Sequence, residues 1–169
     1  SPESEQRAFP APLKYLCKGL ERSLCTYDAV VVADWRNNPG LSQEMYEELK
    51  RLIEMNTKVA ICHIESFLYL TDVQLPKSEP VRQLLHTGQI DEVFMDDPIQ
   101  ADYVIVRQPE TLRYPPYITC TWRVNNFITI VDESYGEESA YIDVDYINNI
   151  KEMFALVPTF IIKKPKLGS

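Results

Sequence analysis

Residues 28–43 read DAVVVADWRNNPGLSQ, and this stretch decides the expected fold. The run 28–33 is apolar and rich in valine, which is typical of a strand that is covered on both faces in a parallel sheet. Pro39 and Gly40 then break the chain, and a helical pattern begins at Leu41. A buried strand, a polar turn and a helix in this order are the start of a βαβ unit.

The helix after the turn has the clearest signals in the chain. Ser42 is its expected N-cap, glutamates follow early, and Lys50 and Arg51 come late, which is the order that a helix dipole favours. The apolar residues recur on one face: Leu41, Met45, Leu49, Leu52 and Ile53. We therefore predict a helix in this segment.

Strands and helices continue to alternate along the chain. Further strands are expected at 58–64, 90–94, 101–109, 125–133 and 159–164. Further helices are expected at 81–85, before a left-handed Gly88, and at 143–154, where Asp143 is the cap and the shared face is Val144, Ile147, Ile150 and Phe154. The pattern predicts an α/β protein, a Rossmann-like three-layer domain with a mainly parallel sheet of about six strands. Segments 30–32, 59–61, 104–106 and 128–130 should be central and buried.

The pattern also divides the chain. Residues 1–26 form a lead-in with a short helix, whose expected apolar face is Leu13, Leu16, Cys17, Leu20 and Leu24. Residues 27–164 form the Rossmann-like domain, and 165–169 are a tail or cloning remnant. The first residues lack a starting Met and any signal-peptide pattern, so we expect a piece of a longer protein.

Composition narrows the function classes. The formal net charge of -8 disfavours nucleic acid as a partner, and no apolar run is long enough to span a membrane. The four cysteines, Cys17, Cys25, Cys62 and Cys120, contain no C-x-x-C pair. We predict free thiols, a buried Cys62 and a cytoplasmic location.

Ligands of such sheets bind beyond the carboxyl ends of the strands, so the residues that follow each strand are the candidates for a cleft or ligand site. These candidates are Asp34, Trp35, Arg36, Asn38, His63, Arg107 and Asp132, with Trp35 expected at the surface. Arg107 ends a very apolar strand, so it should either bind a ligand carboxylate or phosphate or form a salt bridge with Asp34 or Asp97. His63 is either a ligand contact or a histidine hydrogen-bonded at a strand end.

The common cofactor motifs are missing. A pyrophosphate loop G-x-G-x-x-G needs three glycines, and the first turn has only Gly40, so a dinucleotide site is not expected. Two histidines, His63 and His86, are too few for a His-based metal cluster. Asp96 and Asp97 precede Pro98, which predicts a turn in preference to a cation site.

The order of YDAVVVADWR, KVAICHIE, VRQLLHTGQIDEVFMDD, ADYVIVRQPETL and FITIVDE resembles the amino-terminal Rossmann-like half of bacterial glycosyltransferases of the two-domain GT-B type. The resemblance covers roughly residues 27–163. It includes an acidic-aromatic-basic turn at 34–36 and an Arg-x-Pro at 107–109. It implies two facing Rossmann domains, of which this chain is the first, with a sugar acceptor and a nucleotide-sugar donor as partners and no bound metal or other cofactor. Asp34, Arg36, His63 and Arg107 would then have acceptor-side or cleft-forming roles.

Two other function classes stay open. Where that family has an Asn-Gln-Pro-Pro type turn, this sequence has Asp132, Glu133 and Ser134, which favours a non-catalytic interaction domain of a larger surface-polysaccharide protein. A regulatory α/β domain would require Asp34 and Asp97 to meet around a cation.

Overall fold

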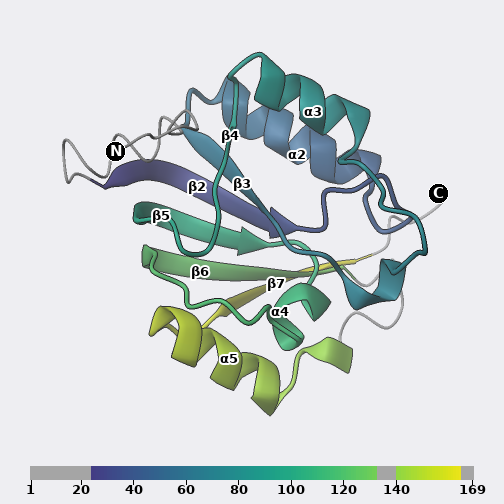
Figure 1. Ribbon diagram of the computed structural model, residues 1–169. Coiled ribbons are helices and arrows are strands. Elements are labelled where there is room, and N and C mark those ends of the chain that lie inside the picture. The colour runs from purple at the N-terminus through teal and green to yellow at the C-terminus, as the bar shows by residue number, and fades with distance from the viewer. Residues whose placement is uncertain (1–23, 133–139, 165–169) are drawn as a thin grey trace, which may run out of the picture.

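The computed structural model describes residues 24–132 and 140–164 (Figure 1). Within these residues one sheet contains six strands: β2 (Cys25–Ala33), β3 (Val59–His63), β4 (Asp91–Glu92), β5 (Ile99–Val106), β6 (Arg123–Asp132) and β7 (Thr159–Lys163). The strand order is β4-β3-β2-β5-β6-β7, and every neighbouring pair is parallel. The predicted Rossmann-like α/β fold is confirmed.

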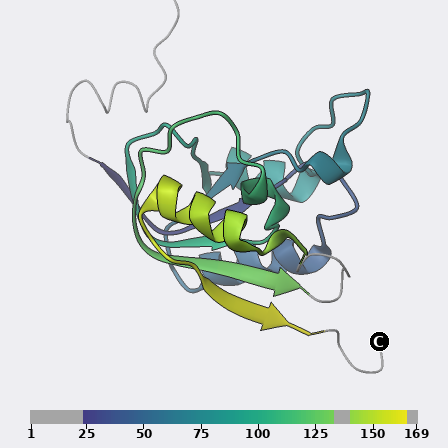
Figure 2. The ribbon, with the colours of Figure 1, turned by 90° about the horizontal axis from the view of Figure 1, so that it is seen from below.

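Helices cover both faces of this sheet. α2 (Gln43–Glu54) and α3 (Glu79–His86) lie on one face, and α4 (Glu110–Arg113) and α5 (Val144–Phe154) lie on the other, with the short 3-10 helix η1 (Phe67–Tyr69) after β3 (Figures 1 and 2). The predicted caps at Ser42 and Asp143 and the left-handed Gly88 are confirmed, whereas α3 extends beyond the predicted 81–85 at both ends. Ser42 Oγ accepts from the Met45 N–H, Asp143 Oδ1 accepts from the Tyr146 N–H, and Gly88 has a φ of 77°.

The strand order places two polar segments together. The chain passes from β2 through β3 to β4 at one edge and then returns to β5 on the other side of β2. The carboxyl ends of β2 and β5 therefore meet where the order reverses, which is the usual ligand crevice of this fold. Residues 34–36 and 107–108 follow these two strands.

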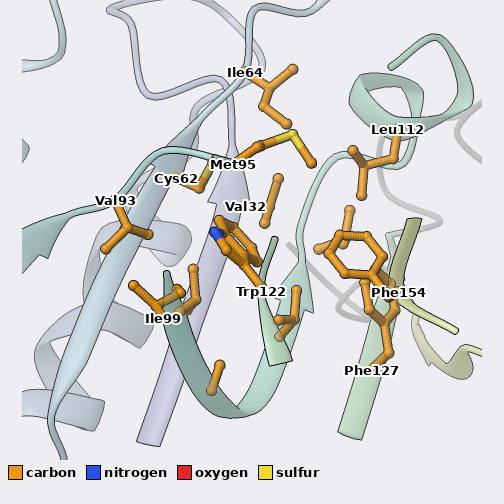
Figure 3. Packing of buried hydrophobic residues seen from close by; sticks show 14 of the residues in the cluster. Val32, Cys62, Ile64, Val93, Met95, Ile99, Leu112, Trp122, Phe127 and Phe154 are labelled. Atoms are coloured by element: carbon orange, nitrogen blue, oxygen red, sulfur yellow. The ribbon is translucent and has the colours of Figure 1, made fainter. Parts of the chain in front are cut away.

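The larger apolar core lies on the α4 and α5 face (Figure 3). Over β2 and β3 it is closed by irregular chain: the Trp122 indole N–H donates to the Phe94 carbonyl (2.9 Å), and the Thr121 N–H donates to the Met95 carbonyl (2.9 Å). The labelled core residues in Figure 3 include Val32, Cys62, Met95, Leu112, Trp122, Phe127 and Phe154.

The opposite face is covered over only half of its width. α2 and α3 pack over β2 and β3 through Trp35, Met45, Leu49, Ile61 and Val81, which are all buried. β5 and β6 alternate instead between buried residues on the α5 face and partly exposed ones on the α2 face. The prediction that 104–106 and 128–130 are fully buried is therefore wrong for the partly exposed members: Ile105, Ile128 and Ile130. Among the described elements, no helix crosses that part of the sheet.

Three further details differ from the predictions or lie outside the described residues. The third strand is shorter than expected, because only Asp91 and Glu92 pair with β3. α5 buries Tyr146 together with Ile150 and Phe154, whereas Val144 is 71% exposed. The predicted helix in 1–26 falls almost wholly in residues 1–23, which are not described. Cys17 and the 165–169 tail also lie outside the described residues.

Cys62 is buried, as predicted, and burial raises the pKa of its thiol to about 12. The other two described cysteines, Cys25 and Cys120, are partly buried, and all three are free thiols. None of the helices within 24–132 and 140–164 has the length and apolar character needed to cross a bilayer.

Candidate functional site

The turn after β2 is tied together by a buried ion pair. Asp34 is 0% exposed, and its Oδ1 and Oδ2 accept from Arg36 Nε (2.9 Å) and Nη2 (2.6 Å). Burial alone would raise the pKa of Asp34, but the hydrogen bonds from Arg36 and from the Ser66 N–H outweigh it and hold the pKa below its usual value. The Asp34 carboxylate is thus fully engaged inside the protein.

Trp35 is 0% exposed, so the expectation that it lies at the surface is wrong. The backbone N–H of Trp35 donates to His63 Nδ1 (3.0 Å), and its backbone carbonyl accepts from the Ser78 N–H (2.9 Å). The next residue, Arg36, forms an isolated antiparallel bridge with Lys77. The chain at 34–36 therefore joins the end of β3 to the start of α3.

The crevice between β2 and β5 is filled by Gln108. Its Oε1 accepts from the Asp34 N–H (2.7 Å) and its Nε2 donates to the Gly40 carbonyl (3.1 Å). Asn38 shapes the same turn, since its Oδ1 accepts from the Gly40 N–H (2.8 Å). A Cβ at Gly40 would meet the hydroxyl end of the Tyr69 ring, so this glycine packs closely against a tyrosine, and a larger residue would displace that ring.

Arg107 pairs with neither Asp34 nor Asp97, contrary to the salt bridges proposed from the sequence. Its Nε lies 2.9 Å from Glu48 Oε1 on α2, and its Nη2 lies 3.8 Å from Asp132 Oδ2 at the end of β6. Arg107 is only 3% exposed, and Asp132 is also buried. These two candidates therefore lie together on the α2 face of the sheet, where they connect that helix to β5 and β6.

Asp96 and Asp97 form a turn, as predicted. The Asp97 N–H donates to the Phe94 carbonyl (3.0 Å), and Asp97 Oδ2 accepts from the Phe94 N–H (2.8 Å). Among the described residues, no group of three or more His, Cys, Asp or Glu side chains is arranged to hold a metal ion.

A hollow of about 310 Å³ opens at the carboxyl end of β3. Its lining residues are Cys62, His63, Ile64, Glu65, Phe94, Met95, Tyr114, Pro116 and Ile118. Phe94 and Tyr114 are 49% and 55% exposed, and the Phe67 ring packs edge-on against Tyr114 at 5.1 Å between centroids. Of this set, only His63 was a candidate predicted from the sequence, because 94–95 and 114–118 are loop residues without a motif.

His63 lines this hollow and has a defined hydrogen-bond donor. Its Nδ1 accepts from the Trp35 N–H, so the ring proton of the neutral imidazole is on Nε2. Burial lowers the pKa of His63, which favours this neutral form, although Asp34 opposes the shift. Glu65 is 47% exposed and supplies an acceptor beside it.

Asp34 and Glu110 fix the backbone that carries these two groups. The Ser66 N–H donates to Asp34 Oδ2 (2.8 Å), and the Ser66 hydroxyl donates to Glu110 Oε2 (2.8 Å). Burial raises the pKa of Glu110, whose Oε1 has no hydrogen-bond partner among the described residues. Arg36 Nη1 also lies 3.7 Å from Glu65 Oε1. Asp34 and Arg36 are thus positioning residues for the hollow, not part of its surface.

A second hollow, of about 280 Å³, lies between α2 and the uncovered part of the sheet. Its walls are mostly aliphatic and include Leu49, Leu52, Met55, Ile105 and Ile130. It offers little polar chemistry to orient a ligand.

Comparisons of this chain with models of protein families, with curated proteins and with solved structures found no match.

Proposed function

We propose that this chain is the acceptor-side, amino-terminal domain of a bacterial GT-B type glycosyltransferase of cell-surface polysaccharide synthesis. It would act in the cytoplasm and would not be catalytic alone. The proposal rests on the resemblance of the sequence to that family and on the chemistry of the hollow at the end of β3.

The observation that carries the proposal is the combination of aromatic walls with one donor and one acceptor. The exposed rings of Phe94 and Tyr114 offer apolar faces against which the C–H groups of a sugar ring can pack. His63 Nε2–H and the Glu65 carboxylate can bond the hydroxyls at the ring edge. Small-molecule sites are commonly apolar hollows of this size with a few placed polar groups.

The filled crevice between β2 and β5 supports the absence of a donor site in this domain. Gln108 and Tyr69 occupy the space beside Gly40 where a pyrophosphate would approach the backbone in a dinucleotide-binding fold. A nucleotide-sugar would therefore be bound by a second domain, and the present chain would supply the acceptor.

A glycan array probed with the labelled 169-residue chain tests this proposal. We expect retention on a subset of glycans, loss of retention in Tyr114→Ala, and no loss in Tyr103→Ala, which removes a comparably exposed tyrosine on β5. Incubation with nucleotide-sugars should give no turnover. Retention that is equal in both variants, or absent from every glycan, would contradict an acceptor site in the hollow.

One observation favours the second candidate, a non-catalytic interaction or regulatory domain. The segment after β3 exposes large apolar side chains, with Phe67 and Leu68 at 42% and 45% and Leu70 and Val73 both at 69%. Exposed apolar groups that lie close together are typical of contact surfaces. In that case Leu70→Ser would abolish binding to a partner protein.

A further inference from the structure

We infer that the hollow at the end of β3 takes an uncharged sugar ring and discriminates against rings that carry a carboxylate or phosphate. The inference rests on the proposed function and adds the chemical class of the acceptor. Its basis is the state of the charged groups that border the hollow.

The first bordering cation is Arg36. Its guanidinium is held bidentate by the buried Asp34 carboxylate, and its remaining Nη1 lies 3.7 Å from Glu65 Oε1. Paired with one carboxylate and close to a second, this guanidinium has no unmatched charge to offer an anion.

The other two cations near the hollow are also paired. The charge of Lys77 helps to lower the pKa of His63, and Lys77 Nζ lies 3.2 Å from Glu92 Oε2. Arg113 lies against the Tyr114 ring, 4.8 Å from its centroid, and its guanidinium contacts the carboxylates of Asp143 (2.9 Å) and Asp145 (3.1 Å). Within the described residues, each cation at this rim thus has its own carboxylate partner.

The remaining charge that lines the hollow is negative. Glu65 is the charged residue of the lining and is 47% exposed, while His63 is neutral because its Nδ1 is occupied by the Trp35 N–H and its ring is largely buried. The whole chain adds a net charge of -8 to the surroundings. A carboxylate on the sugar would therefore meet a like charge with no compensating cation.

The polar groups that remain match hydroxyls. His63 has one N–H donor and Glu65 has one carboxylate acceptor, and the two residues are two positions apart in the chain. The His63 N–H can therefore donate to one hydroxyl of a sugar ring while the Glu65 carboxylate accepts from a neighbouring hydroxyl. The aromatic residues Phe94 and Tyr114 add contact area that needs no charge.

Matched pairs of methyl glycosides test the inference. Methyl glucoside, galactoside and mannoside are each compared with the corresponding methyl uronoside, which differs only in a carboxylate at C6. Binding to the isotope-labelled 169-residue chain is measured by NMR at pH 7.5 and low salt, where electrostatic screening is weak. We expect at least one neutral glycoside to shift the His63 and Tyr114 signals, and the corresponding uronoside to bind about tenfold more weakly. Raised salt should reduce this difference in affinity.

The control variants separate the possible failures. Glu65→Gln should reduce the difference in affinity between glycoside and uronoside. Glu54 is an exposed carboxylate on α2 outside the hollow, so Glu54→Gln should leave this difference in affinity unchanged. A uronoside that binds as tightly as its neutral partner would overturn the charge inference and leave the proposed acceptor site standing. If no glycoside shifts these signals, both the proposed function and the inference fail.

Discussion

Asp34 has no exposed surface, and its carboxylate accepts hydrogen bonds from Arg36 Nε, Arg36 Nη2 and the Ser66 N–H. A single substitution can therefore measure how much this carboxylate contributes to stability. Removing its charge leaves the buried Arg36 guanidinium with only the more distant, partly exposed Glu65 carboxylate (3.7 Å) as a counter-ion. Loss of one partner of a buried pair typically costs about 3–5 kcal/mol. Asp34→Asn should therefore lower the free energy of unfolding in urea by an amount of this order.

The matched control is the exposed pair of Glu79 and Arg82 on α3, whose side chains are 61% and 50% exposed. Exposed pairs of this kind contribute little to stability, because water and salt screen their attraction. Glu79→Gln should thus have little effect on the same urea transition. A comparable loss in both variants would show that the Asp34 pair is not an internal anchor.

The same ion pair has a defined pH dependence. Because the pKa of Asp34 is lower in the folded chain than in the unfolded one, its contribution to stability is present above the unfolded value of about 3.9 and is lost as pH falls through the lower, folded value. The difference in unfolding free energy between the unmodified chain and Asp34→Asn should shrink as the pH is lowered below about 4. A difference that stays constant with pH would indicate a packing effect only.

His63 shifts in the direction that keeps it uncharged. Burial is the largest influence on His63 and lowers its pKa, so the imidazole takes up its second, charging proton less readily in the folded chain than in the unfolded chain. The stability of the fold should therefore fall as the pH drops below about 6.5. NMR of labelled histidine should show the proton on Nε2 at pH 7.5. A proton on Nδ1 would contradict the hydrogen bond from the Trp35 N–H.

At the scale of the element, the covered and the uncovered halves of the α2 face of the sheet should respond differently to the same truncation. Ile61 on β3 lies under the helices and is 0% exposed, whereas Ile128 on β6 lies on the uncovered part of the same face and is partly exposed. Ile→Ala in a full core costs about 2–5 kcal/mol, and a side chain still in contact with water loses less. Ile128→Ala should therefore cost less than half as much as Ile61→Ala in urea denaturation. Equal costs would mean that this face of β6 is covered in solution.

The helix caps give a second comparison between elements. Ser42 caps α2 with a hydrogen bond from the Met45 N–H, whereas Ser78 stands at the same position of α3 without any side-chain cap bond. Loss of an N-cap hydrogen bond costs about 1 kcal/mol. Ser42→Ala should thus destabilise the chain by about this amount, measured as a shift of the urea midpoint, and Ser78→Ala by clearly less.

At the scale of the whole molecule, the strand order creates a crevice that the side chains then close. Gln108 joins β5 to the first turn, and Tyr69 packs against Gly40 from the loop after β3. Titration of the 169-residue chain with nucleotide-sugars, followed by calorimetry or NMR, should therefore show no binding between β2 and β5. Shifts confined to the Gln108 and Gly40 signals would instead show that the crevice opens to a nucleotide.

Local patterns in the sequence were enough to predict the architecture. The valine-rich run before Asp34, the cap at Ser42 and the left-handed Gly88 each act through neighbours a few residues away, so α/β alternation and helix ends could be derived without contacts. The polar residues after each strand could also be placed at the carboxyl edge, because parallel strands end on one side.

Only the tertiary structure decided what those polar residues do. Trp35 is buried, Asp34 pairs with Arg36, and Arg107 pairs with Glu48, because partners 2 to 59 positions apart in the chain meet at the sheet edge and satisfy one another. The hollow at the end of β3 likewise joins His63 to Phe94 and Tyr114 from loops with no motif. Pairing of buried charges and the shape of a hollow depend on distances through space, and a sequence pattern records only distances along the chain.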